Sequence, residues 1–258
     1  MGIDRRKFLT IAGLTTLTAF GRKVPGVVPA EDSTLAQFDI PTPLSGKRWA
    51  LVIDPRKCLQ QEGCRDCIDA CHQTHNVPQF DNPKDEIKWI WKEHFEEAFP
   101  GQDHPYIDEN LKEKPVLVMC NHCDNPPCVR VCPTQSTWKR EDGIVMMDMH
   151  RCIGCRYCVA ACPYGSRSFN WRDPRPFIKD TNEKYPTRMR GVVEKCNFCA
   201  ERLAEGLLPA CVEACKHGAL TFGDLDDPES EVRKILQSHY AIRRKPSLGT
   251  QPQVYYLV

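Results

Sequence analysis

The 258-residue sequence lacks the features of a membrane-spanning chain, of a nucleotide-binding enzyme and of a nucleic-acid-binding protein. No stretch reaches about 18 apolar residues, which a helix needs in order to cross a bilayer. Neither G-x-G-x-x-G nor a Walker loop is present to bind a nucleotide phosphate. Basic and acidic residues number 35 and 34, so the net charge of +1 favours neither nucleic acid nor another strongly charged partner.

The sequence is unusual in its 16 cysteines. Exposed thiols oxidise, so cysteines in this number must be committed to disulfides, to zinc or to iron–sulfur clusters. They fall into four groups of four, and none is left over. The groups are Cys58, Cys64, Cys67 and Cys71; Cys120, Cys123, Cys128 and Cys132; Cys152, Cys155, Cys158 and Cys162; and Cys196, Cys199, Cys211 and Cys215.

The third group has the spacing C-x2-C-x2-C-x3-C and is followed by Pro163, a pattern typical of bacterial ferredoxins. Disulfide scaffolds suit shorter secreted chains, and structural zinc prefers two C-x2-C pairs per site. No C-x-x-C-H motif indicates covalent haem. The cysteines therefore predict four [4Fe–4S] clusters. Because thiolate fills every iron position, no iron is left for a substrate, which predicts a non-catalytic electron-transfer protein.

The spacing also predicts which cysteines share a cluster. The second and third groups both end in Cys-Pro and lie close together in the chain, so they are expected to pair, which leaves the first with the fourth. In two-cluster ferredoxins the last cysteine of each group ligates the neighbouring cluster. The predicted ligand sets are Cys120, Cys123, Cys128 and Cys162; Cys152, Cys155, Cys158 and Cys132; Cys58, Cys64, Cys67 and Cys215; and Cys196, Cys199, Cys211 and Cys71.

Short apolar runs before each group predict strands at 49–53, 116–119, 144–147 and 191–193, with a hairpin turn at 141–143. The expected fold class is α+β, with two ferredoxin-like modules, each binding two clusters, and loop-rich insertions. Residues 31–75 and 188–258 would form an outer module, 116–187 a central module and 76–115 an insertion. The apolar tail 255–258 is expected either to pack on a partner or to close a sheet of its own chain.

The beginning of the sequence predicts a twin-arginine export signal over residues 1–30. Arg5 and Arg6 precede a mildly apolar stretch of about a dozen residues, which is too short to cross a membrane. The alternative is an amphipathic helix in which the two arginines occur by chance. Clusters are assembled in the reducing cytoplasm, so a cluster protein has to be exported already folded. The signal thus predicts the periplasmic side of the cytoplasmic membrane, with attachment through protein partners.

Two motifs, C-N-H-C-D-N-P-P-C at 120–128 and R-C-I-G-C-R-Y-C at 151–158, carry a family resemblance. Over residues 48–225 the chain resembles the four-cluster ferredoxin subunits of bacterial membrane oxidoreductases, of the dimethyl sulfoxide and polysulfide reductase type. With the leader, the stretches 165–177 and 248–250 are most similar to the periplasmic ferredoxin subunits of Dsr transmembrane complexes, which are associated with sulfite reduction. The chain differs from the family pattern in the five-residue spacer between Cys58 and Cys64. If Cys58 were not a ligand, its site would hold a three-iron cluster.

The resemblance implies the crossed ligand sets and a relay of electrons through four [4Fe–4S] clusters. The implied partners are an integral membrane subunit of the polysulfide reductase type, which interacts with quinone, and a multihaem cytochrome c in the periplasm. Such a hetero-oligomeric complex would serve anaerobic respiration in sulfur metabolism and would bind no nucleic acid. The alternative is the electron-transfer subunit of an exported molybdopterin oxidoreductase.

Overall fold

The computed structural model describes residues 42–102, 105–107 and 109–258, and the statements below concern these residues. The expected leader, residues 1–30, lies outside them. The described residues all belong to one compact unit of the chain. Each of their helices is too short or too polar to span a membrane.

Short helices alternate with short strands, which confirms the α+β class. The strands are β1 (Trp49–Ile53), β2 (Ile90–Glu93), β3 (Val116–Met119), β4 (Thr137–Lys139), β5 (Val145–Met147), β6 (Ser168–Phe169), β7 (Val193–Glu194), β8 (Leu220–Asp224), β9 (Ala241–Ile242) and β10 (Val254–Leu257). The α-helices are α2 (Pro55–Leu59), α3 (Asp66–Thr74), α4 (Phe95–Ala98), α5 (Glu109–Glu113), α6 (Pro127–Arg130), α7 (Tyr157–Ala161), α8 (Ala200–Ala204), α9 (Ala210–Glu213) and α10 (Glu231–Ser238). Single 3-10 turns occur at Pro83–Asp85, Arg175–Phe177 and Pro246–Leu248.

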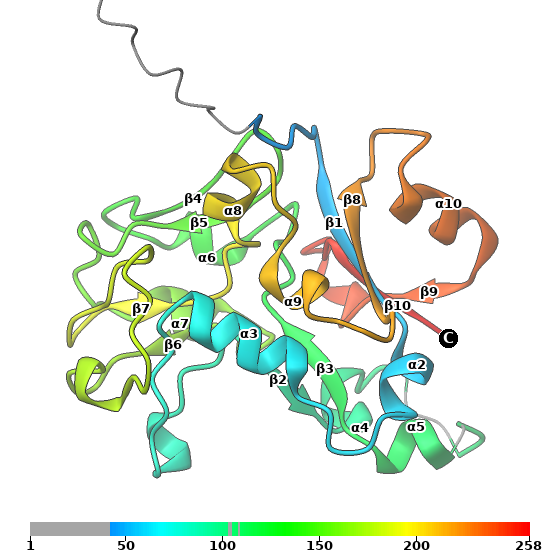
Figure 1. The fold of residues 1–258 in the computed structure, drawn as a ribbon, viewed down its shortest axis with the longest axis horizontal. Coiled ribbons are helices and arrows are strands. Elements are labelled where there is room, and N and C mark those ends of the chain that lie inside the picture. Colours follow the sequence, from blue (N-terminus) through cyan, green and yellow to red (C-terminus); the bar gives the residue numbers. More distant parts are fainter. Residues whose placement is uncertain (1–41, 103–104, 108) are drawn as a thin grey trace, which may run out of the picture. The chain divides into compact units, whose positions relative to one another are not determined.

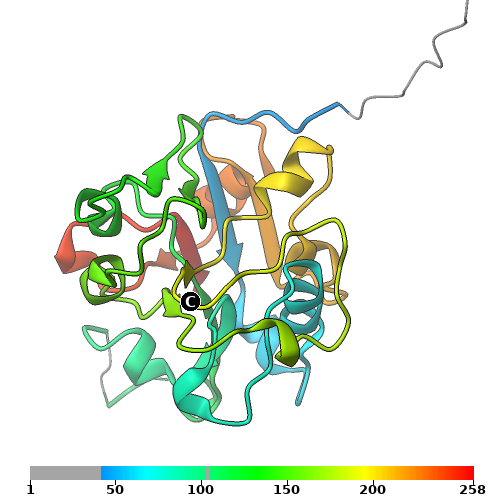
Figure 2. The same cartoon turned by 90° about the vertical axis from the view of Figure 1, so that its left-hand side faces the viewer.

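The largest sheet has the strand order β8-β1-β10-β9 (Figure 1). All five residues of β1 are apolar and buried, as expected for a central strand covered on both faces. It pairs antiparallel with β8, where Leu51 lies opposite Phe222, and parallel with β10, where Val52 lies opposite Tyr255. Helix α10 covers one face by packing Val232 against residues of β1. Figure 2 shows β1 and β8 running side by side.

The C-terminal tail is the strand β10 of this sheet. Its residues Val254 and Tyr256 have no exposed surface, and β10 pairs with both β1 and β9. Of the two roles expected for the tail, docking on a partner is therefore wrong, and closure of the chain's own sheet is confirmed. Apolar side chains spaced two apart in a strand face the same side, and here that side is the main core.

The segment between the first two cysteine groups belongs to the core. Strand β2 lies in this segment and pairs antiparallel with β3, which leads to Cys120. Trp89, Ile90 and Phe99 are almost fully buried in the largest apolar cluster, which also includes β1. The predicted insertion at 76–115 thus supplies a strand beside the second cysteine group.

Two further antiparallel pairs, β4 with β5 and β6 with β7, complete the strand pairing of the described residues. The expected turn at 141–143 joins β4 to β5, and Gly143 takes a positive φ of 86° there, which glycine adopts without strain. The expected strand at 191–193 starts instead at Val193. Gly191 has φ of 90° and donates its N–H to the Asn170 carbonyl, so it forms part of the turn before the strand.

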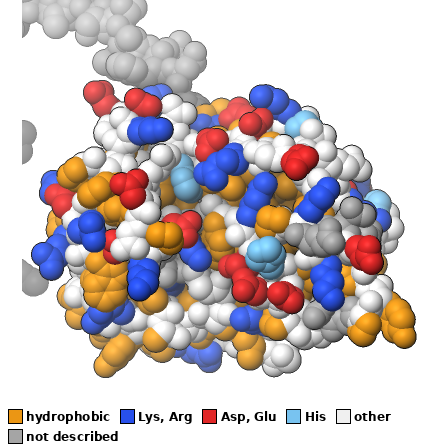
Figure 3. All heavy atoms as spheres, turned by 90° about the horizontal axis from the view of Figure 1, so that it is seen from below, with side chains coloured by type: hydrophobic (Ala, Val, Ile, Leu, Met, Phe, Trp, Pro, Cys, Tyr) orange, Lys and Arg blue, Asp and Glu red, His pale blue; other side chains and the backbone are white. Residues whose placement is uncertain are grey.

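Exposed charges of both signs are interspersed on the face drawn in Figure 3. Apolar side chains lie scattered among them. The mixed surface charge agrees with the nearly balanced numbers of basic and acidic residues. The unusual charged residues of this protein are therefore the buried ones.

Candidate metal centres

Cavity A is lined by Cys58, Cys64, Cys67 and Cys215. Cys58 lies on α2, whose first turn is fixed by Asp54: its side chain accepts hydrogen bonds from the backbone N–H groups of Arg56 and Lys57. Helix α2 therefore occupies part of the unusually long spacer and turns Cys58 toward the other thiols. The fold brings together the four cysteines of one predicted set.

Cavity B is lined by Cys71, Cys196, Cys199 and Cys211. Cys71 comes from α3, whereas the other three come from the fourth cysteine group. Two backbone N–H groups donate to these sulfurs, from Phe198 to Cys196 Sγ and from Ala210 to Cys199 Sγ, each at 3.4 Å. Hydrogen bonds of this kind stabilise thiolates and lower the electron density on sulfur.

Cavity C is lined by Cys120, Cys123, Cys128 and Cys162. The first three follow β3 or lie on α6. Cys162 follows α7, where the backbone becomes extended (φ −81°, ψ 110°), and this turns its side chain away from the loop of its own group. Cavity C thus contains a third complete predicted set.

The fourth set is Cys132, Cys152, Cys155 and Cys158. Cys158 packs in an apolar cluster with Cys128, and Cys152 lies against the same cluster. Cys132 Sγ lies 3.2 Å from Ser136 Oγ and 3.7 Å from Thr134 Oγ1. Although burial raises the pKa of Cys132, its hydrogen bond with Ser136 and others lower it to about 7. The grouping of these four rests on their spacing rather than on a cavity.

Comparison with known proteins identifies the family to which this chain belongs. A model of the 4Fe-4S dicluster domain matches residues 116–175 and 181–225. The chain is 39% identical to the Hdr-like menaquinol oxidoreductase iron-sulfur subunit 1 of Archaeoglobus fulgidus, over 98% of this chain and 97% of the relative. The chain belongs to the 4Fe–4S dicluster ferredoxin subunits of respiratory oxidoreductases.

Other relatives of this dicluster protein have similar names. It is 37% identical to the iron-sulfur subunit of the arsenate respiratory reductase from a Shewanella species, over 81% of this chain and 96% of the relative. It is 38% identical to the iron-sulfur cluster-binding subunit of menaquinone reductase from Nitratidesulfovibrio vulgaris, over 81% and 88%. The protein is therefore an electron-transfer subunit of a larger oxidoreductase complex and not itself an enzyme.

Sixteen cysteines and a dicluster domain are consistent with four [4Fe–4S] clusters, and the chemistry of the dicluster protein's cavities fits them. Each cavity offers four sulfur donors, the set that iron–sulfur clusters prefer. Burial is the main cause that raises the pKa of the Cys67, Cys123 and Cys196 thiols to about 12. At neutral pH these thiols are protonated without a metal, so a cluster has to displace their protons when it binds. When bound, the clusters supply one-electron redox chemistry.

Unpaired donors provide a second test of the fit. Asn121 Nδ2 and Arg167 Nη2 are buried and have no hydrogen-bond partner among the residues that the structure describes. Both side chains line cavity C. A buried donor without an acceptor is costly, and the sulfur atoms of a bound cluster would accept from these groups.

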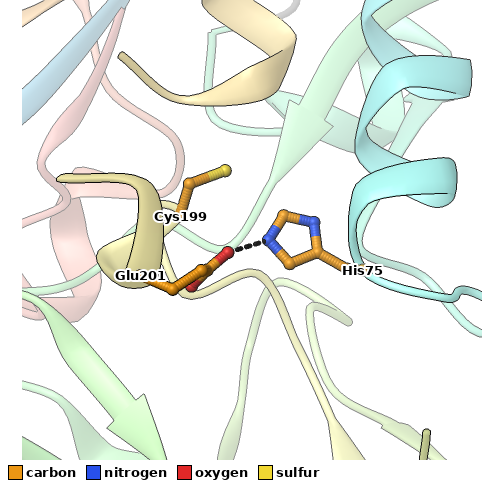
Figure 4. A group of neighbouring side chains, drawn as sticks. All are labelled: His75, Cys199 and Glu201. Atoms are coloured by element: carbon orange, nitrogen blue, oxygen red, sulfur yellow. Dashed lines mark hydrogen bonds and ion pairs between the residues drawn. The ribbon is translucent and has the colours of Figure 1, made fainter. Parts of the chain in front are cut away.

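A buried histidine lies beside cavity B of the dicluster protein. Figure 4 shows His75 pointing toward Glu201, with Cys199 next to them. His75 Nε2 lies 2.6 Å from Glu201 Oε1, and Nδ1 lies 2.9 Å from the Cys71 carbonyl oxygen. The ligand atoms of the three side chains lie within 4.8 Å of one another, close enough to hold a metal ion. Both ring nitrogens already face oxygen acceptors, however, and Cys199 shares its cavity with three thiols. We therefore interpret His75 and Glu201 as a hydrogen-bonded wall of cavity B.

Sequence reasoning missed three buried polar residues at these sites, His75, Arg167 and Lys195. Only His75 left a signal, since it lies four positions after Cys71 and thus on the same face of a helix. Arg167 and Lys195 have relative exposures of 4% and 2%. Charged residues are seldom buried without a partner, so no sequence pattern would have placed them inside.

Proposed function

We propose that this chain relays electrons through four clusters, held by the crossed sets of cysteines, between a quinone-interacting membrane subunit and a periplasmic cytochrome c. The complex would belong to sulfur respiration, as in the Dsr type. Cavities A, B and C, each with the four thiols of one crossed set, carry this proposal. The division into an outer and a central module stays a prediction that follows from the same pairing.

The order of the sites supports a relay. At each junction, a thiol of one site lies close enough to raise the pKa of one thiol in the adjoining site, in addition to the larger effect of burial. Cys67 raises the pKa of Cys71 at the junction of cavities A and B, and Cys120 raises that of Cys196 at the junction of B and C. Between cavity C and the fourth set, Cys128 raises the pKa of Cys158. Four sites in a row give an electron one path from end to end.

The relatives' names support a quinone partner, since they include a menaquinol oxidoreductase and a menaquinone reductase. In washed membranes that contain the native complex, a menaquinol analogue is expected to reduce the clusters, as followed by electron paramagnetic resonance under anaerobic conditions. A polysulfide-reductase-type membrane subunit and a multihaem cytochrome c are expected to copurify with the chain. Equal reduction of the isolated chain by the quinol, or copurification with a molybdopterin protein in place of the cytochrome, would contradict the proposal.

The leader proposal has its own test. Replacement of both Arg5 and Arg6 by Lys is expected to leave cluster-loaded protein in the cytoplasm, because the twin-arginine route exports folded proteins with their cofactors. Cell fractionation with iron analysis measures this, and substitution of Lys7 by Arg is the control that keeps the pair intact. Periplasmic accumulation of the double variant at the wild-type level would show that residues 1–30 are not such a signal.

A further inference from the structure

Two cations lie inside the protein with only neutral partners. Arg167 donates from Nη1 to Thr137 Oγ1 at 3.1 Å and lies 3.6 Å from Met147 Sδ. Lys195 Nζ donates to the Cys196 carbonyl at 2.7 Å and to the Val145 carbonyl. Arg188, by contrast, forms a buried ion pair with Glu194. In the part of the chain that the structure describes, Arg167 and Lys195 have no such carboxylate.

A buried charge without a counter-charge is strongly unfavourable, so an anion has to compensate these two groups when they are charged. Burial lowers the pKa of Arg167, but Cys128, Cys158 and Cys120 outweigh it and the net shift is upward. The anionic groups that face the guanidinium are therefore cysteine sulfurs. The Arg167 side chain lines cavity C, and its Nη2 finds no hydrogen-bond partner within the described ranges of the chain.

The two cations flank the same cavity. Arg167 lines cavity C, and its guanidinium interacts electrostatically with Cys120 and Cys128 of that cavity and with Cys158 of the fourth set. Lys195 Nζ donates to the carbonyl of Val145, a residue that lines cavity C, and to that of Cys196, a ligand of cavity B. Burial lowers the pKa of Lys195, and the thiols of Cys120 and Cys196 oppose that shift. Cavity A has a different neighbour: Lys92 interacts with Cys58 there, and its side chain is only partly buried, so water screens its charge.

We propose that Arg167 and Lys195 give the cluster in cavity C the highest reduction potential of the four, so that an electron in the row rests there. The proposal rests on the ligand sets of the proposed function. The step is the transfer of one electron: the cluster of an adjoining site is oxidised by one electron, the cavity C cluster is reduced by one, and no bond or proton changes. Reduction adds negative charge beside the positive charges of Arg167 and protonated Lys195 in a medium of low dielectric constant, which favours the reduced state.

The test is a redox titration of the full chain, followed by electron paramagnetic resonance, with Arg167→Gln. This change removes the charge and keeps a polar side chain. The midpoint potential of the cavity C cluster is expected to fall by at least about 59 mV, a tenfold change in its one-electron reduction equilibrium. The fourth-set cluster should shift less, and those of cavities A and B should not move. Arg167→Lys, which keeps the charge, is expected to restore most of the potential.

A matched control removes an exposed charge close to the same cluster. Arg130 lies two residues after Cys128 and is exposed, so Arg130→Gln is expected to change the equilibrium much less than tenfold. Lys195→Met is a second test, because it should lower the potentials of the cavity B and C clusters even if Arg167→Gln fails to fold.

Cys123→Ser identifies the signal of cavity C. If iron stays at about 16 per chain in Arg167→Gln and the cavity C potential does not fall, the proposal is overturned while the proposed function stands. The same holds if another cluster is reduced first in the wild type. If Cys123→Ser instead perturbs clusters outside cavity C, the ligand sets are wrong, and the proposed function fails together with this inference.

Discussion

Cys162→Ser is expected to damage the cluster in cavity C and to leave the cluster held by the rest of its own cysteine group. Cys162 closes the C-x2-C-x2-C-x3-C run, but it lines cavity C with Cys120, Cys123 and Cys128. After burial, the nearby Cys120 thiol is the largest cause that raises the pKa of Cys162. Serine is a poor ligand for iron, so the cavity C cluster should be lost or altered.

Iron analysis and electron paramagnetic resonance measure this result. The wild type is expected to hold about 16 irons per chain when isolated anaerobically, and the variant about 12. Cys158→Ser is the matched variant, since the residue lies one helical turn earlier on α7 and belongs to the fourth set. The two variants should lose different signals. Loss of the same signal in both would contradict the crossed ligation, and about 13 irons in the wild type would indicate a three-iron cluster at Cys58.

The parts of the site that could be predicted from the sequence are those in which covalent chemistry constrains the chain. Iron needs thiolates at fixed spacings, so the loop that holds Cys152, Cys155 and Cys158 is readable from four cysteines and a proline. Gly154 belongs to the same constraint: a Cβ there would lie 2.4 Å from the Gly191 carbonyl oxygen. Strand β1 was predictable because all of its residues are apolar and β-branched or bulky residues dominate it.

The rest depends on contacts between distant segments. Nothing local in residues 90–93 or 254–257 indicates which strand they pair with, because pairing is decided by the core that both strands share. The role of α2 in bringing Cys58 to cavity A depends on the N-cap residue Asp54, which lies before the cysteine group. Hydropathy cannot predict that Arg167 and Lys195 are buried, because the groups expected to compensate their charges are bound clusters, which the amino-acid sequence does not encode.

Glu194→Gln is expected to produce the largest loss of stability among the substitutions considered. The Glu194 side chain is fully buried, and its Oε2 lies 2.5 Å from Arg188 Nη2. It also accepts hydrogen bonds from Trp89 Nε1 at 2.9 Å and Asn170 Nδ2 at 2.6 Å. Arg188 in turn donates to the carbonyl of Asn76 at 2.8 Å. The pair thus joins β7 to the end of α3, to the segment before β2 and to the turn after β6.

Removal of the carboxylate charge leaves Arg188 buried and unpaired, which costs about 3–5 kcal/mol. For a chain of this size, that corresponds to a fall of about 6–20 °C in the temperature at which the visible cluster absorbance is lost. The double variant Arg188→Met with Glu194→Gln buries no charge and is expected to lose less than the sum of the two single variants. Asp173→Asn breaks the exposed ion pair with Arg175 and should leave the transition unchanged. A transition of Glu194→Gln at the wild-type temperature would mean that the pair contributes nothing to holding these four segments together.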